Sequence, residues 1–269
     1  MQGERRPLVT IITIVYNGEK FIADCINSVR RQNYPDLQYI IVDGGSTDGT
    51  LDIVARHRDI VTDLISEKDE GISDAFNKGI LRANGEIIGL INTDDWYEDG
   101  AIEKAVRAME DNDVVYGDLR YWNNGQPDYI AKGNHLHLNR EMTVNHPTVF
   151  IKRSCYQRFG SFDKQYKCAM DYDLLLRLSV NNCRFHYIPA VLANMRWGGL
   201  SDNRWMMGVR ETRSIKNKYL GDRKLQNSLY FFKQVTAIGL PRFLNTIGLG
   251  FLIRLYRSSQ VNPKKVYER

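Results

Sequence analysis

Short uninterrupted runs of apolar residues alternate with segments of helical periodicity along the first 120 or so positions of the chain. Apolar runs without polar alternation are typical of strands buried on both faces of a parallel sheet. Such runs occupy residues 8–15, 37–42, 61–66, 86–91 and 114–116. Between them, apolar residues recur at the spacing of a helix face in residues 21–29, 51–56, 72–80 and 101–109. This alternation predicts an α/β fold of βαβ units, with a mostly parallel sheet and helices on both faces.

One predicted strand ends in two adjacent carboxylates. The run 86–91 is followed by Asn92, Thr93, Asp94 and Asp95, and ligands of open α/β sheets bind at the carboxyl ends of the strands. Adjacent carboxylates repel each other unless a cation shares them, and oxygen ligands suit Mg²⁺ or Mn²⁺ together with substrate phosphates. The alternative interpretation of the pair is the start of a solvated turn.

Another predicted strand also ends in an acid. Asp43 follows the run 37–42 and begins Asp-Gly-Gly-Ser-Thr-Asp-Gly. If the two strands are neighbours, Asp43 and Asp94 lie on the same ligand-binding edge. The Asp43 carboxylate is suited to accept a hydrogen bond from a base N–H, and the glycines permit close approach of a ligand. The same composition also fits a tight turn followed by a helix N-cap.

Charge divides the chain into two parts. The 269 residues carry 37 Lys and Arg against 32 Asp and Glu. Residues 1–203 carry 23 basic and 29 acidic residues, whereas residues 204–269 carry 14 and 3. A basic tail of this kind meets anionic surfaces. We therefore expect a catalytic domain at 1–203 and a basic amphipathic helical extension at 204–269.

The apolar residues of the tail limit its relation to a membrane. Its longest charge-free stretch is 243–253, which is shorter than the roughly 20 residues that a spanning helix needs. A basic amphipathic helix lying on the membrane surface fits better, and the alternatives are docking on the catalytic domain or a dimer contact. The amino-terminal residues contain no apolar signal region, so we expect a cytoplasmic protein, peripheral on the inner face of the cell membrane.

Five ordered motifs give the chain a resemblance to a known family. They are residues 10–17 (TIITIVYN), 41–50 (IVDGGSTDGT), 67–79 (EKDEGISDAFNKG), 91–96 (INTDDW) and 171–174 (DYDL). Together they resemble the family 2 glycosyltransferases of the GT-A, or nucleotide-diphospho-sugar transferase, fold. Within that family the chain is similar to bacterial enzymes of colanic-acid and exopolysaccharide biosynthesis. The four cysteines show no metal-ligand spacing, and we interpret them as reduced thiols.

The resemblance implies a nucleotide site. Residues 13–17 would flank the base, Asp43 would hold it, and residues 69–77 would line the nucleotide and donor-sugar pocket. Asn92, Asp94 and Asp95 stand at the family's DxD-type motif, which positions a metal and the donor's ribose and diphosphate, and here Asn92 replaces the first acid. The implied nucleotide-binding residues are Thr13, Val15, Tyr16, Asn17, Asp43, Ser46, Asp69, Gly71, Asp74, Asn77, Thr93 and Asp94. The implied ligands of Mn²⁺ or Mg²⁺ are Asp94 and Asp95.

The resemblance also implies a catalytic base. Transfer of a sugar to a hydroxyl group needs a carboxylate that takes the hydroxyl proton. Asp171 matches the family's base, while Met170 replaces the Glu that usually precedes it. The alternative role of Asp171 is to N-cap the helix that follows, with Asp173 in its first turn responding to the helix dipole.

Two further segments carry weaker candidates. His146 begins what looks like a strand near the site, and it is an acceptor-side candidate, although a lone histidine is usually structural. Residues 196–201 (RWGGLS) resemble a flexible family loop that covers the donor diphosphate, and Arg196 or Trp197 could meet phosphate or sugar there. A plain glycine-rich loop is the alternative.

These observations favour an inverting, metal-dependent glycosyltransferase. It would move a sugar from a nucleotide-diphosphate sugar, a UDP-sugar by resemblance, to a lipid-linked saccharide in surface polysaccharide biosynthesis. A non-catalytic sugar-nucleotide-binding scaffold at the membrane and a sugar nucleotidyltransferase are the alternatives. The phosphate loop of a nucleotidyltransferase is missing after the first strand, where the chain reads Tyr16-Asn-Gly-Glu-Lys-Phe. No nucleic-acid-binding motif accompanies the basic tail, so we expect no nucleic-acid partner.

Overall fold

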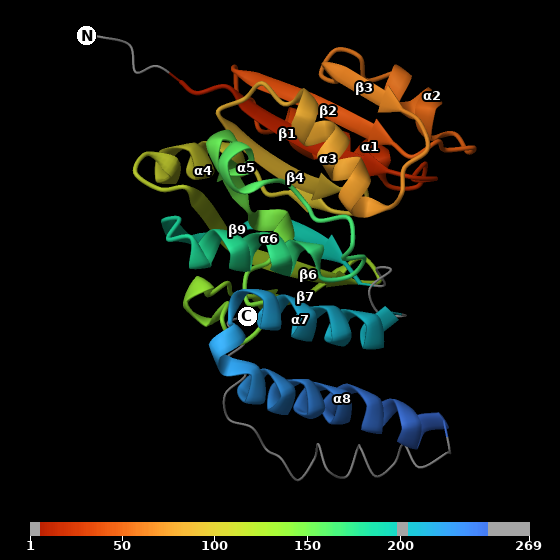
Figure 1. Cartoon of the computed structure of the whole chain (residues 1–269). Helices are drawn as coiled ribbons and strands as arrows, with labels where there is room; N and C mark the ends of the chain where they lie inside the picture. Colours follow the sequence, from red (N-terminus) through yellow and green to blue (C-terminus); the bar gives the residue numbers. More distant parts are fainter. Residues whose placement is uncertain (1–5, 198–203, 247–269) are drawn as a thin grey trace. The chain divides into compact units, whose positions relative to one another are not determined.

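The computed structural model describes residues 6–197 and 204–246 (Figure 1). The chain forms two compact units, Met1–Gly199 and Leu200–Arg269. The first unit holds the sheet, and the second holds the carboxyl-terminal helices.

Four parallel strands form the amino-terminal half of the sheet. In spatial order they are β3 (Asp63–Ser66), β2 (Leu37–Asp43), β1 (Val9–Val15) and β4 (Ile87–Asn92). The register of β1 places Val15 beside Asp43 and Ile14 beside Asn92. The carboxyl ends of β2, β1 and β4 therefore meet at one edge, as expected, although β2 and β4 are not neighbours because β1 lies between them.

Helices cover both faces of these strands, which explains their continuous apolar sequences. Ile11 and Ile41 pack in one core with residues of α1 (Ile22–Arg30), α2 (Thr50–Ala55) and α4 (Ala101–Met109). Ile12, which points the opposite way, meets α3 (Ile72–Arg82). A Cβ atom on Gly79 of α3 would lie 2.5 Å from Cγ2 of Ile12, so α3 packs closely on the sheet through this glycine.

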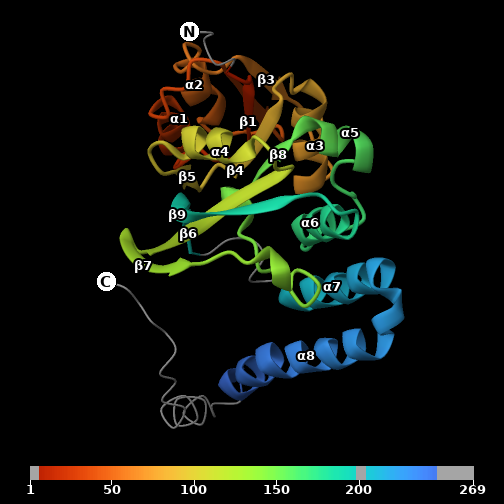
Figure 2. The same cartoon turned by 90° about the vertical axis from the view of Figure 1, so that its left-hand side faces the viewer.

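The second half of the sheet is mixed, in contrast to the mostly parallel arrangement expected. Its strands are β5 (Trp96–Tyr97), β6 (Val114–Asn123), β7 (Gln126–Ala131), β8 (Phe150–Lys152) and β9 (Phe185–Arg196). The whole sheet has the order β3-β2-β1-β4-β8-β6-β9-β5, and β7 pairs with β6 as a long hairpin (Figure 2). β8 is antiparallel to β4 and β6, whereas β9 is parallel to β6.

Two short segments and two helices complete this unit. The 3₁₀ segments are η1 (His135–His137) and η2 (His146–Thr148), and the helices are α5 (Arg153–Phe159) and α6 (Met170–Val180). The expectation that a strand begins at His146 is wrong, because the proline at position 147 enters the 3₁₀ turn η2 and the strand begins at Phe150.

The second unit contains α7 (Trp205–Tyr219), the 3₁₀ turn η4 (Gly221–Arg223) and α8 (Lys224–Thr246), so the helical nature predicted for the tail is confirmed. Polar and aromatic contacts join α7 to α8: Asn227 donates to the Asn217 side chain at 3.1 Å, and the Lys216 ammonium lies 3.8 Å from the Tyr230 ring centroid. Within the described residues, no helix is both long and apolar enough to cross a membrane.

Candidate active site

Two loops are hydrogen-bonded to each other at the carboxyl edge of β1 and β2. The Asn17 N–H donates to the Ser46 hydroxyl, and the Thr47 N–H donates to the Asn17 side-chain oxygen, both at 2.8 Å. Asn17 has a φ of 49°, a left-handed conformation that asparagine tolerates. Tyr16 beside it is 65% exposed, which leaves its aromatic ring open at this edge.

Asp43 holds the loop that follows β2 in place through hydrogen bonds. Its carboxylate is fully buried and accepts hydrogen bonds from the Gly45 and Ser46 N–H groups and from the Ser66 hydroxyl. The implied role of Asp43 in holding a nucleotide base stays a prediction. The carboxylate oxygens are directed at the loop because the buried charge needs these donors, so Asp43 shapes the turn 44–46.

Asp69 lies on the open side of the same loop. A Cβ atom on Gly44 would lie 2.5 Å from Oδ2 of Asp69. Asp69 can approach Gly44 this closely because glycine has no side chain. The Asp69 carboxylate also accepts the Gly71 N–H at 2.8 Å, and Gly71, with a φ of 115°, leads into α3. Asp69, Ser46 and Tyr16 therefore converge at the edge predicted to bind the nucleotide.

Three predicted nucleotide residues have structural partners instead. Thr13 is fully buried, with its hydroxyl 3.0 Å from that of Tyr39. The Asn77 side chain donates to the Phe162 carbonyl at 2.8 Å and accepts the Phe162 N–H at 2.9 Å. Asp74 forms ion pairs with the lysines at positions 78 and 164, at 3.5 and 3.2 Å. Apart from the Asp74–Lys78 pair, which lies within one helical turn, these partners come from distant segments and gave no sign in the motif.

Val15 and Thr93 support the backbone of the site. The Val15 carbonyl accepts the Gly44 N–H at 2.8 Å, and the Thr93 hydroxyl donates to the Ile14 carbonyl at 2.5 Å. Their contacts join the ends of β1, β2 and β4. Val15 makes this contact through its main-chain carbonyl, and Thr93 makes its contact through its side-chain hydroxyl.

The carboxylates of the DxD-type motif differ in exposure. Asp94 is half-buried, whereas Asp95 is 1% exposed. The Asn92 side chain donates to Asp95 Oδ2 at 3.3 Å, and no donor among the described residues reaches Oδ1. Burial, followed by the charge of Asp94, raises the pKa of Asp95 well above its usual value.

This arrangement fits a divalent cation, because a cation would satisfy the unbonded oxygen and offset the repulsion between the two carboxylates. Among the described residues, no cluster of three or more His, Cys, Asp or Glu side chains is placed to hold a metal. From the described part of the chain the site offers Asp94 and Asp95, and Mg²⁺ or Mn²⁺ held by one or two carboxylates would take its remaining ligands from phosphates and water.

Arg196 fixes the turn that carries these acids. It is the last residue of β9, so it belongs to a strand and not to the flexible loop expected. Its guanidinium donates to the Asp94 carbonyl at 2.6 Å and to the Asp24 carboxylate at 2.9 Å, and it lies 4.3 Å from the Trp96 ring centroid. The sequence analysis missed this role because 102 residues separate Arg196 from Asp94. Residues 198–201 of the predicted loop lie outside the described residues.

Asp171 occupies the first turn of α6, which begins at Met170 with Ala169 as its N-cap. The alternative N-cap role of Asp171 is therefore wrong. Its carboxylate is half-buried and accepts the Tyr172 N–H at 2.8 Å. Asp173, also in the first turn, is fully buried and lies 3.7 Å from the Arg177 guanidinium, an ion pair that the sequence analysis did not foresee.

His146 lies close enough to Asp171 for their charges to interact. Its ring packs on Phe76 and Phe162, with centroid separations of 5.5 and 6.1 Å. Burial lowers the pKa of His146, and the negative charge of Asp171 opposes that shift. Residues of η2, α6 and β4, including Leu90, also line a common small void. The acceptor-side candidate and the predicted base are thus neighbours beside β4.

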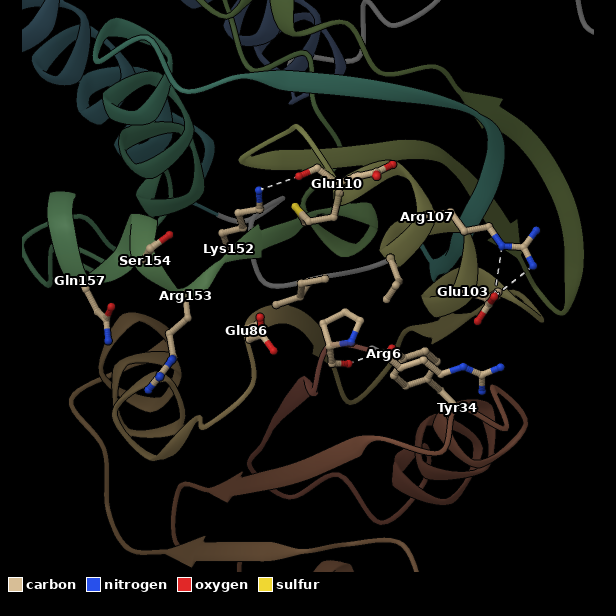
Figure 3. Close-up of a pocket in the computed structure, with 14 residues that line it drawn as sticks. Arg6, Tyr34, Glu86, Glu103, Arg107, Glu110, Lys152, Arg153, Ser154 and Gln157 are labelled. Atoms are coloured by element: carbon tan, nitrogen blue, oxygen red, sulfur yellow. Dashed lines mark hydrogen bonds and ion pairs between the residues drawn. The ribbon is translucent and has the colours of Figure 1, made fainter. Parts of the chain in front are cut away.

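A larger hollow, of about 1090 Å³, lies at the opposite edge of the sheet (Figure 3). It is lined by residues at the amino ends of the strands, among them Glu86. Two of its basic side chains have partners within the protein: Arg107 lies 3.0 Å from the Glu103 carboxylate, and the Lys152 ammonium donates to the Glu110 main-chain carbonyl at 3.2 Å. Since ligands of α/β sheets bind at the carboxyl edge, we place the active site at Asp94.

Comparisons with known proteins identify the family of the chain. The sequence profile described as glycosyl transferase family 2 matches residues 10–173, more than half of the chain. The chain belongs to glycosyl transferase family 2. This glycosyltransferase is 28% identical over 212 residues to the PGL/p-HBAD biosynthesis glycosyltransferase of Mycobacterium bovis, a match that covers 73% of this chain and 80% of the relative. It is 32% identical over 188 residues to the chondroitin synthase of Pasteurella multocida, covering 65% of this chain but 19% of that enzyme.

Solved structures share the fold. S. aureus TarS 1–349 superposes on the glycosyltransferase with a TM-score of 0.67 at 20% identity, covering 85% of this chain and 72% of TarS. The mannosyltransferase PcManGT from Pyrobaculum calidifontis, in complex with GDP-Man and Mn²⁺, gives a TM-score of 0.65 at 17% identity and covers 97% and 82%. The predicted α/β GT-A fold is confirmed.

Proposed function

We propose that this glycosyltransferase transfers a sugar from a UDP-sugar to a lipid-linked saccharide with inversion at the anomeric carbon. The observation that carries the proposal is the convergence of Tyr16, Ser46, Asp69 and Asp94 at one carboxyl edge in a chain of this family. TarS has been solved in complex with UDP-GlcNAc and PcManGT in complex with GDP-Man and Mn²⁺. Both neighbours support a nucleotide-sugar donor.

In this proposal, the donor lies across the ends of β2, β1 and β4. The exposed ring of Tyr16 stacks on the base, while Ser46, Asn17 and the loop held by Asp43 contact the nucleoside. Asp69 and Gly71 line the side of the pocket that holds the donor sugar. Asp94 and Asp95 hold the divalent ion, which when bound offsets charge on the departing diphosphate.

The acceptor reacts on the other side of the donor sugar. Its hydroxyl oxygen forms the new bond to the anomeric carbon as the bond to the diphosphate oxygen breaks, and Asp171 takes the hydroxyl proton. A single displacement of this kind inverts the anomeric centre. His146, whose lowered pKa keeps it neutral near pH 7, packs beside Asp171 on the acceptor side.

The lipid part of the acceptor is assigned from the second unit. Residues 204–269 carry 14 basic and 3 acidic residues, and α8 presents exposed apolar side chains. A basic surface with apolar residues binds anionic membranes. We therefore propose that this unit brings the enzyme to the membrane that holds its acceptor.

Thermal unfolding in the presence of nucleotides tests the donor site. We expect UDP with Mn²⁺ to raise the Tm of the full chain, because a ligand that binds only the native state stabilises it by about 2.7 kcal/mol at 100 times its Kd. GDP and dTDP are the comparison ligands. Asp94→Ala should abolish the manganese-dependent increase, whereas Asp171→Asn should retain it and lose sugar transfer.

The outcomes separate the alternatives. A larger shift with GDP than with UDP would change the donor assigned here. No shift with any of the three nucleotides would refute the transferase proposal and favour a scaffold that has lost its donor site. Transfer that persists in Asp171→Asn would remove this residue as the base.

A further inference from the structure

Three aromatic side chains cluster on the second half of the sheet, two of them stacked and the third tilted against both. Tyr121 of β6 and Tyr129 of β7 are nearly parallel, with ring centroids 4.7 Å apart and an interplanar angle of 11°. The Trp197 ring centroid lies 5.2 Å from that of Tyr121 and 6.0 Å from that of Tyr129. We call Trp197 with these two tyrosines the aromatic platform. Its members come from three separate strands or strand ends.

Two hydrogen bonds hold Trp197 in one orientation. Its main-chain N–H donates to the Trp122 carbonyl at 3.0 Å, and its indole Nε1–H donates to the Asp128 carboxylate at 2.9 Å. Trp197 is nonetheless 47% exposed. An indole fixed on one side and open on the other is poorly explained by core packing, which buries aromatic rings for their area. It is well suited to bind a flat, amphipathic ligand.

A pyranose ring has the required character. Its C–H groups form an apolar face that packs on an aromatic ring, whose face is negative and attracts the positively polarised hydrogens. Its hydroxyls radiate from the edge and need hydrogen-bond partners. Asp128 is exposed beside the indole, and a carboxylate accepts about four hydrogen bonds, so it has capacity for sugar hydroxyls beyond the bond from Trp197.

The position of the platform decides which sugar it binds. Trp197 directly follows Arg196, whose guanidinium is bonded to the Asp94 carbonyl. Tyr16 and Asp69 lie on the β1, β2 and β3 side of β4, whereas the platform lies on the β6 and β9 side. A donor nucleotide bound at Tyr16 and Asp69 therefore leaves the platform to the other substrate.

We propose that Trp197, supported by Tyr121 and Tyr129, stacks against a pyranose ring of the saccharide acceptor, and that Asp128 binds hydroxyls of the same sugar. This inference rests on the proposed transfer to a saccharide. The acceptor subsite then consists of the exposed Trp197 side chain and the Asp128 carboxylate that orients it. Trp197 is a binding residue in this scheme and takes no part in proton transfer.

Saccharide titration of the full chain tests the platform. The probes are methyl glycosides of glucose, galactose, mannose, rhamnose and N-acetylglucosamine, added with UDP and Mn²⁺ present. The readout is the indole N–H resonance of Trp197, assigned from its loss in Trp197→Phe. We expect at least one probe to shift this resonance, and Trp197→Ala to weaken binding of that probe about tenfold, measured by calorimetry. Trp197→Phe should retain part of the affinity and Asp128→Asn should reduce it.

Ile130 provides the matched control. It is an apolar residue of β7 with 42% exposure that adjoins Tyr129 in sequence and points to the other face of the hairpin. Ile130→Ala should leave saccharide binding unchanged. Equal binding by Trp197→Ala and the unaltered chain, or no shift of the Trp197 resonance with any probe, would overturn the platform.

The UDP-dependent increase in Tm, measured on the same samples, separates this proposal from the donor site. If UDP stabilises every variant and Trp197→Ala still binds saccharide, only the platform fails. If UDP stabilises none of them, the proposed function fails first.

Discussion

Asp171 and His146 interact electrostatically, although their environments differ. Asp171 is half-buried in the first turn of α6 and accepts the Tyr172 N–H. His146 packs against Phe76 and Phe162, which stack on each other, and its burial favours the neutral form. In the proposed mechanism, a neutral imidazole at this position places no cation beside the base. The pair therefore has a pH signature that can be measured.

The pKa of His146 in the folded chain should lie below the usual value of about 6.5, because burial disfavours its charged form. The negative charge of Asp171 raises it in part, so Asp171→Asn should lower the pKa of His146 further. NMR titration of the His146 imidazole checks both statements. Between the lowered pKa and about 6.5 the unfolded chain binds more protons, so stability should rise with pH across that window and level off above it.

His135 provides the control, because burial lowers its pKa as well but Asp171 is not among the charges that shift it. The pKa of His135 should therefore be the same in the Asp171→Asn chain as in the unaltered chain. A His146 pKa that is unchanged in Asp171→Asn would show that the two side chains do not interact.

At the scale of elements, the sequence predicted the first half of the sheet better than the second. Residues 8–15 and 86–91 are apolar without alternation because helices cover both of their faces, and that pattern identifies a strand directly. β9 (Phe185–Arg196) is half-exposed and irregularly paired, so it has no such pattern. The hairpin turn Asn124-Gly125, with φ of 48° and 77°, is a recognisable signal that the sequence analysis did not use.

The candidate site was also predicted unevenly, with local features predicted and long-range contacts missed. The acids at strand ends were predictable, since an apolar run followed within a few residues by Asp94 needs only local sequence to be recognised. The partners of Arg196 and Asn77 were not, because the contacts cross 102 and 85 residues of chain. The motif placed Asn77 at the nucleotide, but the fold directs its amide to the main chain of Phe162. Local patterns predict where an element ends, and long-range packing decides what its side chains touch.

Asn77 offers a test of that distinction at the junction of α3 with the segment before α6. Asn77→Ala should leave the Phe162 N–H and carbonyl without their partner and reduce the free energy of unfolding by about 2 kcal/mol, which lowers Tm by roughly 4–8 °C in a domain of this size. Thermal unfolding measures the loss. Asn77→Asp keeps the acceptor for the Phe162 N–H and should be intermediate. The UDP-induced increase in Tm should persist in both variants, and its loss in Asn77→Ala with an unchanged basal Tm would return Asn77 to the nucleotide site.

At the scale of the whole chain, charge and exposed apolar area coincide in one unit. The sheet unit carries the candidate chemistry, and residues 204–269 carry an excess of basic residues. On α8, Leu225, Leu229, Phe232 and Leu240 are between 55% and 75% exposed, and their spacing places them along one face of the helix. The opposite side of α8 meets α7 through Asn227 and Tyr230. A helix fixed on one side, with an apolar stripe on the other, has the form of a surface-binding element.

We predict that this stripe binds anionic bilayers. Leu229→Glu combined with Phe232→Glu should weaken binding to phosphatidylglycerol vesicles at least about tenfold in co-sedimentation, because two apolar side chains leave the interface and two negative charges enter it. Gln226→Glu combined with Ala237→Glu is the matched control: both positions are exposed on the same helix but lie off the stripe, and the change in charge is identical. The control should retain most of the binding, and added salt should weaken binding of both. Equal losses in the two double variants would show that charge alone acts. Unchanged binding in Leu229→Glu/Phe232→Glu would assign the stripe to a protein contact. The concentration dependence of the protein's mass in solution would reveal such a contact.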